Sequence, residues 1–182
     1  MSVLEVVHYG NPILKKKCNS VSDFSKLSDF IDDMFDTMYE EEGIGLAANQ
    51  VGVDMNLFVI DISHTDDNEF PRIFINGKIT SSHGESIFSE GCLSIPQVSL
   101  EVTRPEKIIF KYQDIEEKWH EEEFDGLLAR AIQHEIDHLN GVLIIDLVSE
   151  MQRTRVNKEI KKIKNDSLKK LKQHPITKGF VL

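Results

Sequence analysis

The chain has 182 residues, of which 40% are apolar and 29% charged, and its formal net charge is −10. These values are typical of a single soluble globular domain, which at this length can bury a core without disulfides or metals to hold it together. No run of 18 or more apolar residues occurs, and the first residues lack the basic and apolar regions of a signal peptide, so we expect no membrane span and a cytoplasmic location.

Two further features of the composition bear on organisation. The two cysteines, Cys18 and Cys92, are too few for a disulfide scaffold and fit a reducing compartment. Residues 151–182 carry ten Lys and Arg against two acidic residues, a local charge of +8, so the other 150 residues sum to −18. We therefore expect one acidic domain over residues 1–150, followed by a basic helical extension over residues 151–182.

The first predicted helix spans residues 22–42. Apolar residues recur three and four positions apart, Ser22 is placed to cap the helix, and Gly43 is placed to end it. The segment that follows, GIGLAANQVG, is too rich in glycine for a simple strand or helix.

The middle of the chain has the composition of β-strands. Turns are predicted at Asn76-Gly77 and Pro105-Glu106, and the connections are too short for helical crossovers, so we expect an antiparallel or mixed sheet. The predicted strands are NLFVIDI (56–62), RIFINGKI (72–79), ESIFSEGCLSIP (85–96), SLEVTRP (99–105) and KIIFKYQD (107–114).

The helical period returns after residue 125. An apolar stripe runs from Leu127 to Leu139, Asp125 is placed to cap this central helix, and Gly141 is placed to end it. A last helix is predicted over residues 147–172. The fold class is therefore α+β: an antiparallel or mixed sheet packed around a central helix, with an N-terminal and a C-terminal helix.

The central helix carries a metal-binding pattern. His134 and His138 lie one turn apart, so both imidazoles project from one face with Cβ atoms about 6 Å apart. With Glu135 between them they match H-E-x-x-H, in which the histidines bind zinc and the glutamate is the general base. The alternative is a helix with two surface histidines, but a glutamate beside an apolar stripe is costly to bury without a role.

A third ligand has to come from elsewhere. In the extended pattern H-E-x-x-H-x-x-G-x-x-H it would be residue 144, but Ile144 cannot bind a metal. Glu150 and Glu159, the downstream glutamates, belong to or flank the basic helix. Cys92 is a better candidate because it follows Gly91, where the backbone can approach a partner element.

A thiolate with two imidazoles leaves a fourth tetrahedral position open for water, as in catalytic sites. Two alternatives stay open from the residues alone. Cys92 can be a small buried apolar residue, as many free cysteines are. A closed structural site can also include Cys18, although Glu135 would then have no role.

Three separated motifs, GIGLAANQ (43–50), EGCLS (90–94) and QHEIDHLNG (133–141), together resemble the signature boxes of the peptide deformylase family in order and separation. The opening VVHYGNPILKKKCNSV is also similar to that family, although Lys15 stands where arginine is common. The resemblance covers roughly residues 3–150, which makes this part the catalytic domain. Residues 151–182 resemble the family only in being helical and basic.

The resemblance implies a hydrolase that removes the N-formyl group from the formylmethionine of new proteins and releases formate. It implies one divalent metal, Fe(II), with Zn(II), Ni(II) or Co(II) as substitutes, bound by Cys92, His134 and His138. It gives Glu135 the role of acid and base towards an attacking water. The metal would activate that water, which attacks the formyl carbon.

The oxyanion of the reaction would be stabilised by the Gln50 amide and the backbone N–H of Leu93. The glycine-rich box is expected to bind substrate, because Gly43 and Gly45 let backbone approach a ligand while Ile44 and Leu46 can form an apolar wall for methionine. The resemblance further implies that this box pairs with the peptide as an added strand.

Other expectations concern the surroundings of the site and its partners. Gln133 and Asp137 could each accept an imidazole N–H or simply face solvent, and Glu90 and Arg104 are expected to form an ion pair near Cys92. The expected substrate is the nascent formyl-methionyl peptide. The basic helix is either a solvated helix with a thin apolar stripe or a contact to ribosomal RNA, and we expect neither membrane nor DNA as a partner.

Three other functions share parts of this pattern. A metalloprotease would use His134, Glu135 and His138 but would not need Cys92. A cysteine hydrolase would use Cys92 as its nucleophile and would not need a metal. A non-enzymatic protein with a structural metal would not depend on Glu135.

Overall fold

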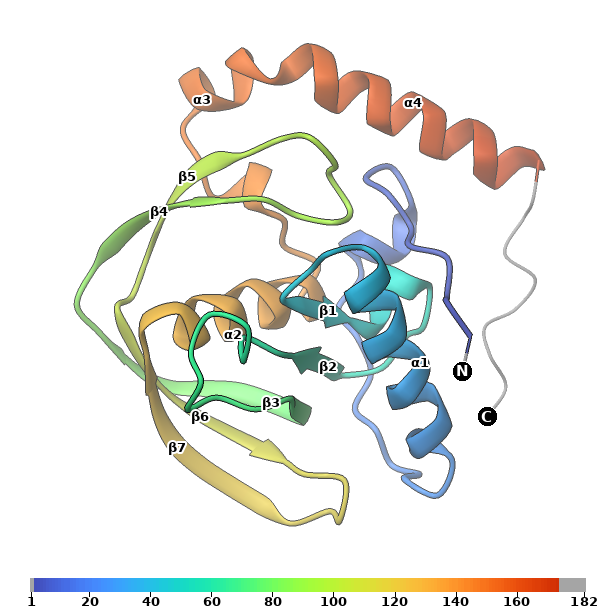
Figure 1. The fold of residues 1–182 in the computed structure, drawn as a ribbon. Coiled ribbons are helices and arrows are strands. Elements are labelled where there is room, and N and C mark those ends of the chain that lie inside the picture. Colours follow the sequence, from blue (N-terminus) through green and yellow to red (C-terminus); the bar gives the residue numbers. More distant parts are fainter. Residues whose placement is uncertain (1, 174–182) are drawn as a thin grey trace.

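A computed structural model describes residues 2–173 and confirms the α+β class, with helices packed around antiparallel strands (Figure 1). Five strands form one sheet in the order β1-β2-β3-β6-β7, and β4 pairs with β5 in a separate sheet. Every pairing is antiparallel. The strands are β1 (Gly45–Ala47), β2 (Leu57–Ile60), β3 (Arg72–His83), β4 (Ser86–Glu90), β5 (Leu100–Arg104), β6 (Lys107–Gln113) and β7 (Trp119–Asp125).

Helix α1 spans Leu27–Glu40, so it begins later than predicted. The side chain of Asp23 accepts hydrogen bonds from the N–H and hydroxyl of Ser25. This local turn keeps residues 22–26 out of the helix. The helix also ends two residues earlier than predicted, and Glu42, not Gly43, takes the left-handed conformation with φ 55°. The N–H of Gly43 then bonds to the carbonyl of Met38 at 2.9 Å, which closes the helix by a Schellman-type bond.

Two predicted strand features differ from the structure. The Asn76-Gly77 turn is wrong: both residues lie inside β3, where Asn76 has φ 54° and the pairing with β6 shifts register. Asn76 uses its side chain to bind both backbone groups of Val21, at 2.7 and 2.9 Å, so the dipeptide forms a bulge and not a hairpin. Strand β7 was not predicted, because its sequence WHEEEFD places only Phe124 in the core.

The predicted turn at Pro105-Glu106 is confirmed, since these residues connect β5 to β6. The predicted strand over residues 85–96 is too long. Its strand conformation ends at Glu90, so Cys92 lies in the connection that follows β4.

The central helix α2 spans Gly126–Leu139, as predicted, and Gly141 (φ 75°) follows its end. Asp125 occupies the N-cap position, but its side chain does not make the predicted capping hydrogen bond. It lies across the inner face of the five-stranded sheet (Figure 1) and buries its apolar stripe there. Stacked and edge-on aromatic rings of β2, β3 and β6 form the floor beneath it: Phe58, Phe74 and Phe110.

The predicted C-terminal helix is two helices, α3 (Glu150–Arg155) and α4 (Asn157–Gln173). They are separated at Val156, where φ is −107° and ψ is 10°. Figure 1 shows α4 running along the outside of the molecule, and its buried Ile160 joins an apolar cluster with residues of β5 and of η3 (Ile144–Asp146). Residues 174–182 of the predicted extension lie outside the described residues. In the part of the chain that the structure describes, no helix combines the length and apolarity needed to span a bilayer.

Candidate active site

Three side chains of metal-binding type converge where α2 passes beneath the end of β4. The sulfur of Cys92 and ring nitrogens of His134 and His138 all lie within 4.8 Å of one another. Cys92 Sγ is 3.2 Å from His138 Nε2, and the two imidazole centroids are 5.0 Å apart. The helix supplies two of these side chains one turn apart and the loop after β4 supplies the third, and they are the three candidate ligands proposed from the sequence.

Glu90 fixes one of the two imidazoles. Its Oε2 lies 3.1 Å from His134 Nδ1, so a neutral His134 that donates this N–H keeps its Nε2 lone pair for a metal. Burial raises the pKa of Glu90, but hydrogen bonds from His134 and Arg104 outweigh it and bring that pKa down to about 2. Glu90 is therefore a buried carboxylate that stays ionised beside the ligands.

The predicted ion pair of Glu90 with Arg104 is confirmed and is bidentate, with N···O distances of 2.7 and 3.0 Å. Asp137 accepts from Arg104 Nη1 at 2.6 Å, so it neither receives an imidazole N–H nor only faces solvent. Gln133 donates to the carbonyls of Pro105 and Ala129 and supports the fold.

Arg130 completes this network and was not predicted. Its guanidinium binds Glu90 Oε1 at 3.0 Å and reaches Ser86 as well. An arginine on a helix usually has a solvated head group, and nothing in its type indicates this role. The one weak sign in the sequence is its position: Arg130 precedes His134 by four residues and therefore shares its face.

Glu135 lies against the glycine-rich box. The residue is 4% exposed, and a Cβ atom at Gly45 would lie 2.6 Å from Glu135 Oε1. Burial raises the pKa of Glu135 to about 7, and its Oε2 has no hydrogen-bond partner among the described residues. A carboxylate with one free oxygen and a pKa near neutrality is suited to take up and release a proton.

Gln50 is oriented by its own turn. It lies in η2 (Ala48–Val51), and its Oε1 accepts the N–H of Ala47 at 2.8 Å. The amide nitrogen therefore points towards the site, 3.3 Å from Ser94 Oγ and 4.0 Å from Cys92 Sγ. The backbone N–H of Leu93 makes no hydrogen bond within residues 2–173 and is free to donate to a ligand.

The donor set fits a metal ion. Burial, and then the neighbouring His134, lower the pKa of His138 well below its usual value, so its imidazole is neutral. Burial also lowers the pKa of His134, but the hydrogen bonds that its ring donates to Cys92 and Glu90 reverse the effect and raise it. Cys92 and Glu90 therefore stabilise a positive charge next to them. A thiolate with two imidazoles suits zinc, iron, nickel or cobalt.

Cys18 lies away from this group. It packs in the apolar cluster beneath α2, and burial raises the pKa of its thiol to about 12. Cys18 does not belong to the group of metal-binding side chains found among the described residues. The alternative of a closed site with both cysteines is therefore wrong.

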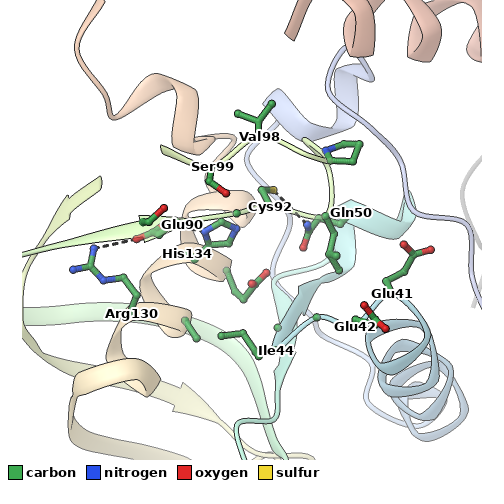
Figure 2. A pocket seen from close by; sticks show the side chains of 18 of the residues that line it. Glu41, Glu42, Ile44, Gln50, Glu90, Cys92, Val98, Ser99, Arg130 and His134 are labelled. Atoms are coloured by element: carbon green, nitrogen blue, oxygen red, sulfur yellow. Dashed lines mark hydrogen bonds and ion pairs between the residues drawn. The ribbon is translucent and has the colours of Figure 1, made fainter. Parts of the chain in front are cut away.

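A cavity of about 910 Å³ opens over Cys92, His134 and Glu135 (Figure 2). Its walls include Gly43, Ile44 and Gly45 on one side and β4 on the other, where the 58% exposed Phe88 was not anticipated. Leu46 does not line it. The side-chain period of two in β1 points Gly45 at Glu135 and Leu46 the other way, into the core under α1, which corrects the expected wall.

The edge of the sheet at β1 is open towards this cavity. The carbonyl of Ile44 accepts the N–H of Asp61 at 3.0 Å, and Gly45 pairs with Ile60 in the next register position. Because hydrogen bonding alternates along an antiparallel pair, the N–H and carbonyl of Gly45 point away from β2. They are available to an extended chain that lies in the cavity.

Comparisons with known proteins agree with this geometry. The model of the family described as polypeptide deformylase matches residues 3–154. A peptide deformylase of Chromobacterium violaceum is 45% identical over 163 residues, which cover 89% of this chain and 96% of that protein. One of Thermodesulfovibrio yellowstonii is also 45% identical, over 88% of this chain and 98% of its own length.

Solved structures show the same fold. The peptide deformylase of Legionella pneumophila superposes with a TM-score of 0.82 at 39% identity, covering 95% of this chain and 99% of that one. That of Synechococcus elongatus, solved in complex with actinonin, gives a TM-score of 0.81 at 42% identity over 87% and 86% of the two chains. The chain therefore belongs to the peptide deformylase family, metal-dependent enzymes that remove the formyl group from an N-terminal methionine.

Proposed function

We propose that Cys92, His134 and His138 bind the catalytic metal of this deformylase and that Glu135 is its acid and base. One observation supports this most: the three ligand atoms lie within 4.8 Å of one another, and Cys92, His134 and Glu135 line the adjoining cavity. We assign Fe(II) as the working ion, with Zn(II), Ni(II) or Co(II) as substitutes. When bound, the metal lowers the pKa of water and polarises the formyl oxygen.

Glu135 moves the proton. Its free Oε2 accepts a proton from the attacking water, whose oxygen forms a bond to the formyl carbon. As the C–N bond breaks, the same carboxyl gives that proton to the departing amine, so formate and a free N-terminus result. The raised pKa of Glu135, caused by burial, suits it to both halves of this exchange.

Two donors stabilise the charge that grows on the formyl oxygen. The amide nitrogen of Gln50 is aimed at the site because its oxygen is held by Ala47, and the N–H of Leu93 is free. Donors held in place before the reaction need no reorganisation as the charge develops.

The peptide binds beside β1. Its backbone pairs with the outward-facing groups of Gly45 as an added strand, while Gly43 and Ile44 line the cavity next to it. The methionine side chain occupies the part of the cavity walled by Ile44 and Leu127, close to the metal.

The substrate is a nascent formyl-methionyl peptide, so we place the enzyme in the cytoplasm. Residues 1–150 form the catalytic domain and residues 151–182 a basic extension. The exposed lysines of α4 support contact with ribosomal RNA, since phosphates attract a basic helix.

The test is formate release from formyl-Met-Ala-Ser by anaerobically purified, metal-loaded enzyme, with and without a chelator. Glu135→Gln keeps the shape of the side chain but cannot accept the proton, so we expect kcat to fall by about 10²- to 10⁴-fold with the metal retained. A chelator should abolish turnover, and added Fe(II) or Co(II) should restore it. Activity that survives chelation but is lost on alkylation of Cys92 would instead indicate a cysteine nucleophile.

A further inference from the structure

The two halves of the site come from separate pieces of the fold. Cys92 lies in the β4–β5 hairpin (residues 86–104), whereas both histidines lie on α2. The hairpin is a sheet of its own, and no backbone hydrogen bond joins it to α2 among the described residues. Every direct hydrogen bond between the hairpin and α2 in the described residues therefore involves a side chain.

Two ion pairs join the hairpin to the helix, and each of the two elements supplies one arginine and one carboxylate. Arg104 of the hairpin binds Asp137 on the helix, at 2.6 Å. Arg130 of the helix binds Glu90 of the hairpin, at 3.0 Å. Glu90 in turn contacts His134, so one carboxylate joins the arginine of the helix to a metal ligand.

Arg130 contacts more groups of the hairpin than Arg104 contacts on the helix. Its Nη1 binds Glu90 and the carbonyl of Val102 at 3.0 and 3.1 Å, and its Nη2 binds the carbonyl and hydroxyl of Ser86 at 2.9 and 2.7 Å. These contacts reach both strands of the hairpin. Arg130 is only 7% exposed, and in Figure 2 it points from α2 towards Glu90 beside the cavity.

We infer that Arg130 is a positioning residue for the metal ligands: its guanidinium ties the hairpin that carries Cys92 to the helix that carries both histidines. The inference depends on the proposed metal site. A planar fork with several donors can satisfy Glu90, Ser86 and Val102 together, which a single ammonium cannot do. Without it, Glu90 keeps Arg104, but the hairpin loses its anchor at Ser86.

The decisive variant is Arg130→Met, which keeps most of the stem and removes the fork. The matched control is Arg72→Met, because Arg72 also pairs with a glutamate, Glu69 at 3.1 Å, but lies on β3 outside the site. Both proteins are loaded with Co(II), and two quantities are measured: the thiolate-to-cobalt absorption band and the rate of metal loss to a chelator.

We expect Arg130→Met to lose Co(II) about 10- to 100-fold faster than wild type, with a shifted or weakened thiolate band. Its kcat should fall more than its KM changes. Arg72→Met should match the wild type in metal loss and in the band, even if its Tm falls.

A wild-type band and rate in Arg130→Met would overturn the inference, whatever its Tm. If that variant does not fold, Arg130→Lys decides, because it keeps a cation beside Glu90 without the fork. It should release Co(II) faster than wild type, and an unchanged rate would overturn the inference. Wild-type protein that binds Co(II) without a thiolate band would instead contradict the proposed metal site.

Discussion

Glu135 owes its position to the missing side chain of residue 45. An added Cβ at Gly45 would lie 2.6 Å from the carboxylate oxygen, and the backbone beside it is fixed by pairing with β2. We predict that Gly45→Ala lowers kcat by about 10²-fold, since a catalytic group moved by about 1 Å loses that much. Formate release and Tm, measured together, separate misplacement from unfolding.

A double-variant cycle tests whether Gly45 acts through Glu135. In the Glu135→Gln background the base is already lost, so adding Gly45→Ala should lower kcat little further. Effects that multiply fully in the double variant would place the role of Gly45 elsewhere, for example in pairing with the peptide.

Gln50 offers a second test at the level of one atom. In Gln50→Glu, one carboxylate oxygen can still accept the N–H of Ala47, but the other replaces the amide nitrogen 4.0 Å from Cys92 Sγ. A donor becomes a negative acceptor, so we predict a loss of about 10²- to 10³-fold in kcat. The comparison is Gln50→Met, which removes the donor without adding charge. If Gln50→Glu were as active as wild type, the oxyanion role would be wrong.

At the residue scale, the motifs predicted which side chains of the central helix come together, but not where every side chain of the glycine-rich box points. H-E-x-x-H on an apolar helix was enough to place His134 and His138 on one face, because helical spacing fixes that geometry. The direction of Leu46 could not be predicted, since the register of a three-residue strand is set by its partner β2. Arg130 was missed because its partners are 28 to 44 residues away in sequence.

Elements were predictable where one face is apolar and the ends carry local signals. The central helix meets both conditions, and its bounds agree with the structure. Strand β7 meets neither, because its side chains are largely charged and it is held by pairing with β6. The Asn76-Gly77 pair is a strong hairpin signal in sequence, but tertiary contacts with Val21 turn it into a bulge.

The bulge leads to a prediction about stability. A Cβ atom at Gly77 would lie 2.3 Å from Cζ of Phe110, a fully buried ring in the core under α2. We predict that Gly77→Ala lowers the free energy of unfolding by about 1–3 kcal/mol through overpacking, measured by urea denaturation. Activity of the folded fraction should be unchanged.

The same ring provides the control for this element. Phe110→Leu alone removes volume and should also destabilise the protein, but combined with Gly77→Ala it makes room for the added methyl group. The loss of unfolding free energy in the double variant should therefore be smaller than the sum of the losses in the two single variants. Strict additivity would mean that Gly77 is required for its backbone conformation and not for space.

Over the whole molecule, charge is separated by element. The basic residues of α3 and α4 lie along the outside, while the body beneath is acidic. A few apolar residues such as Ile160 and a hydrogen bond from Ser167 to the carbonyl of His8 fix α4 to that body. Because Ile160 packs with residues of the β4–β5 hairpin, deleting the extension would disturb the neighbourhood of Cys92 along with any RNA contact. Charge has to be removed without removing the helix.

We therefore predict the behaviour of a variant with Lys161, Lys162, Lys169 and Lys172 changed to glutamine, all of them exposed. If α4 binds ribosomal RNA, co-sedimentation with ribosomes should weaken and depend less steeply on salt, because fewer counterions are released. Turnover of formyl-Met-Ala-Ser should stay at the wild-type value, since Ile160 and the hairpin contact are kept. A matched variant with the exposed body lysines Lys17, Lys26, Lys78 and Lys118 changed to glutamine loses the same amount of charge and should sediment like the wild type. Unchanged sedimentation of the lysine variant would leave α4 as a packing helix whose charges only keep it in solvent.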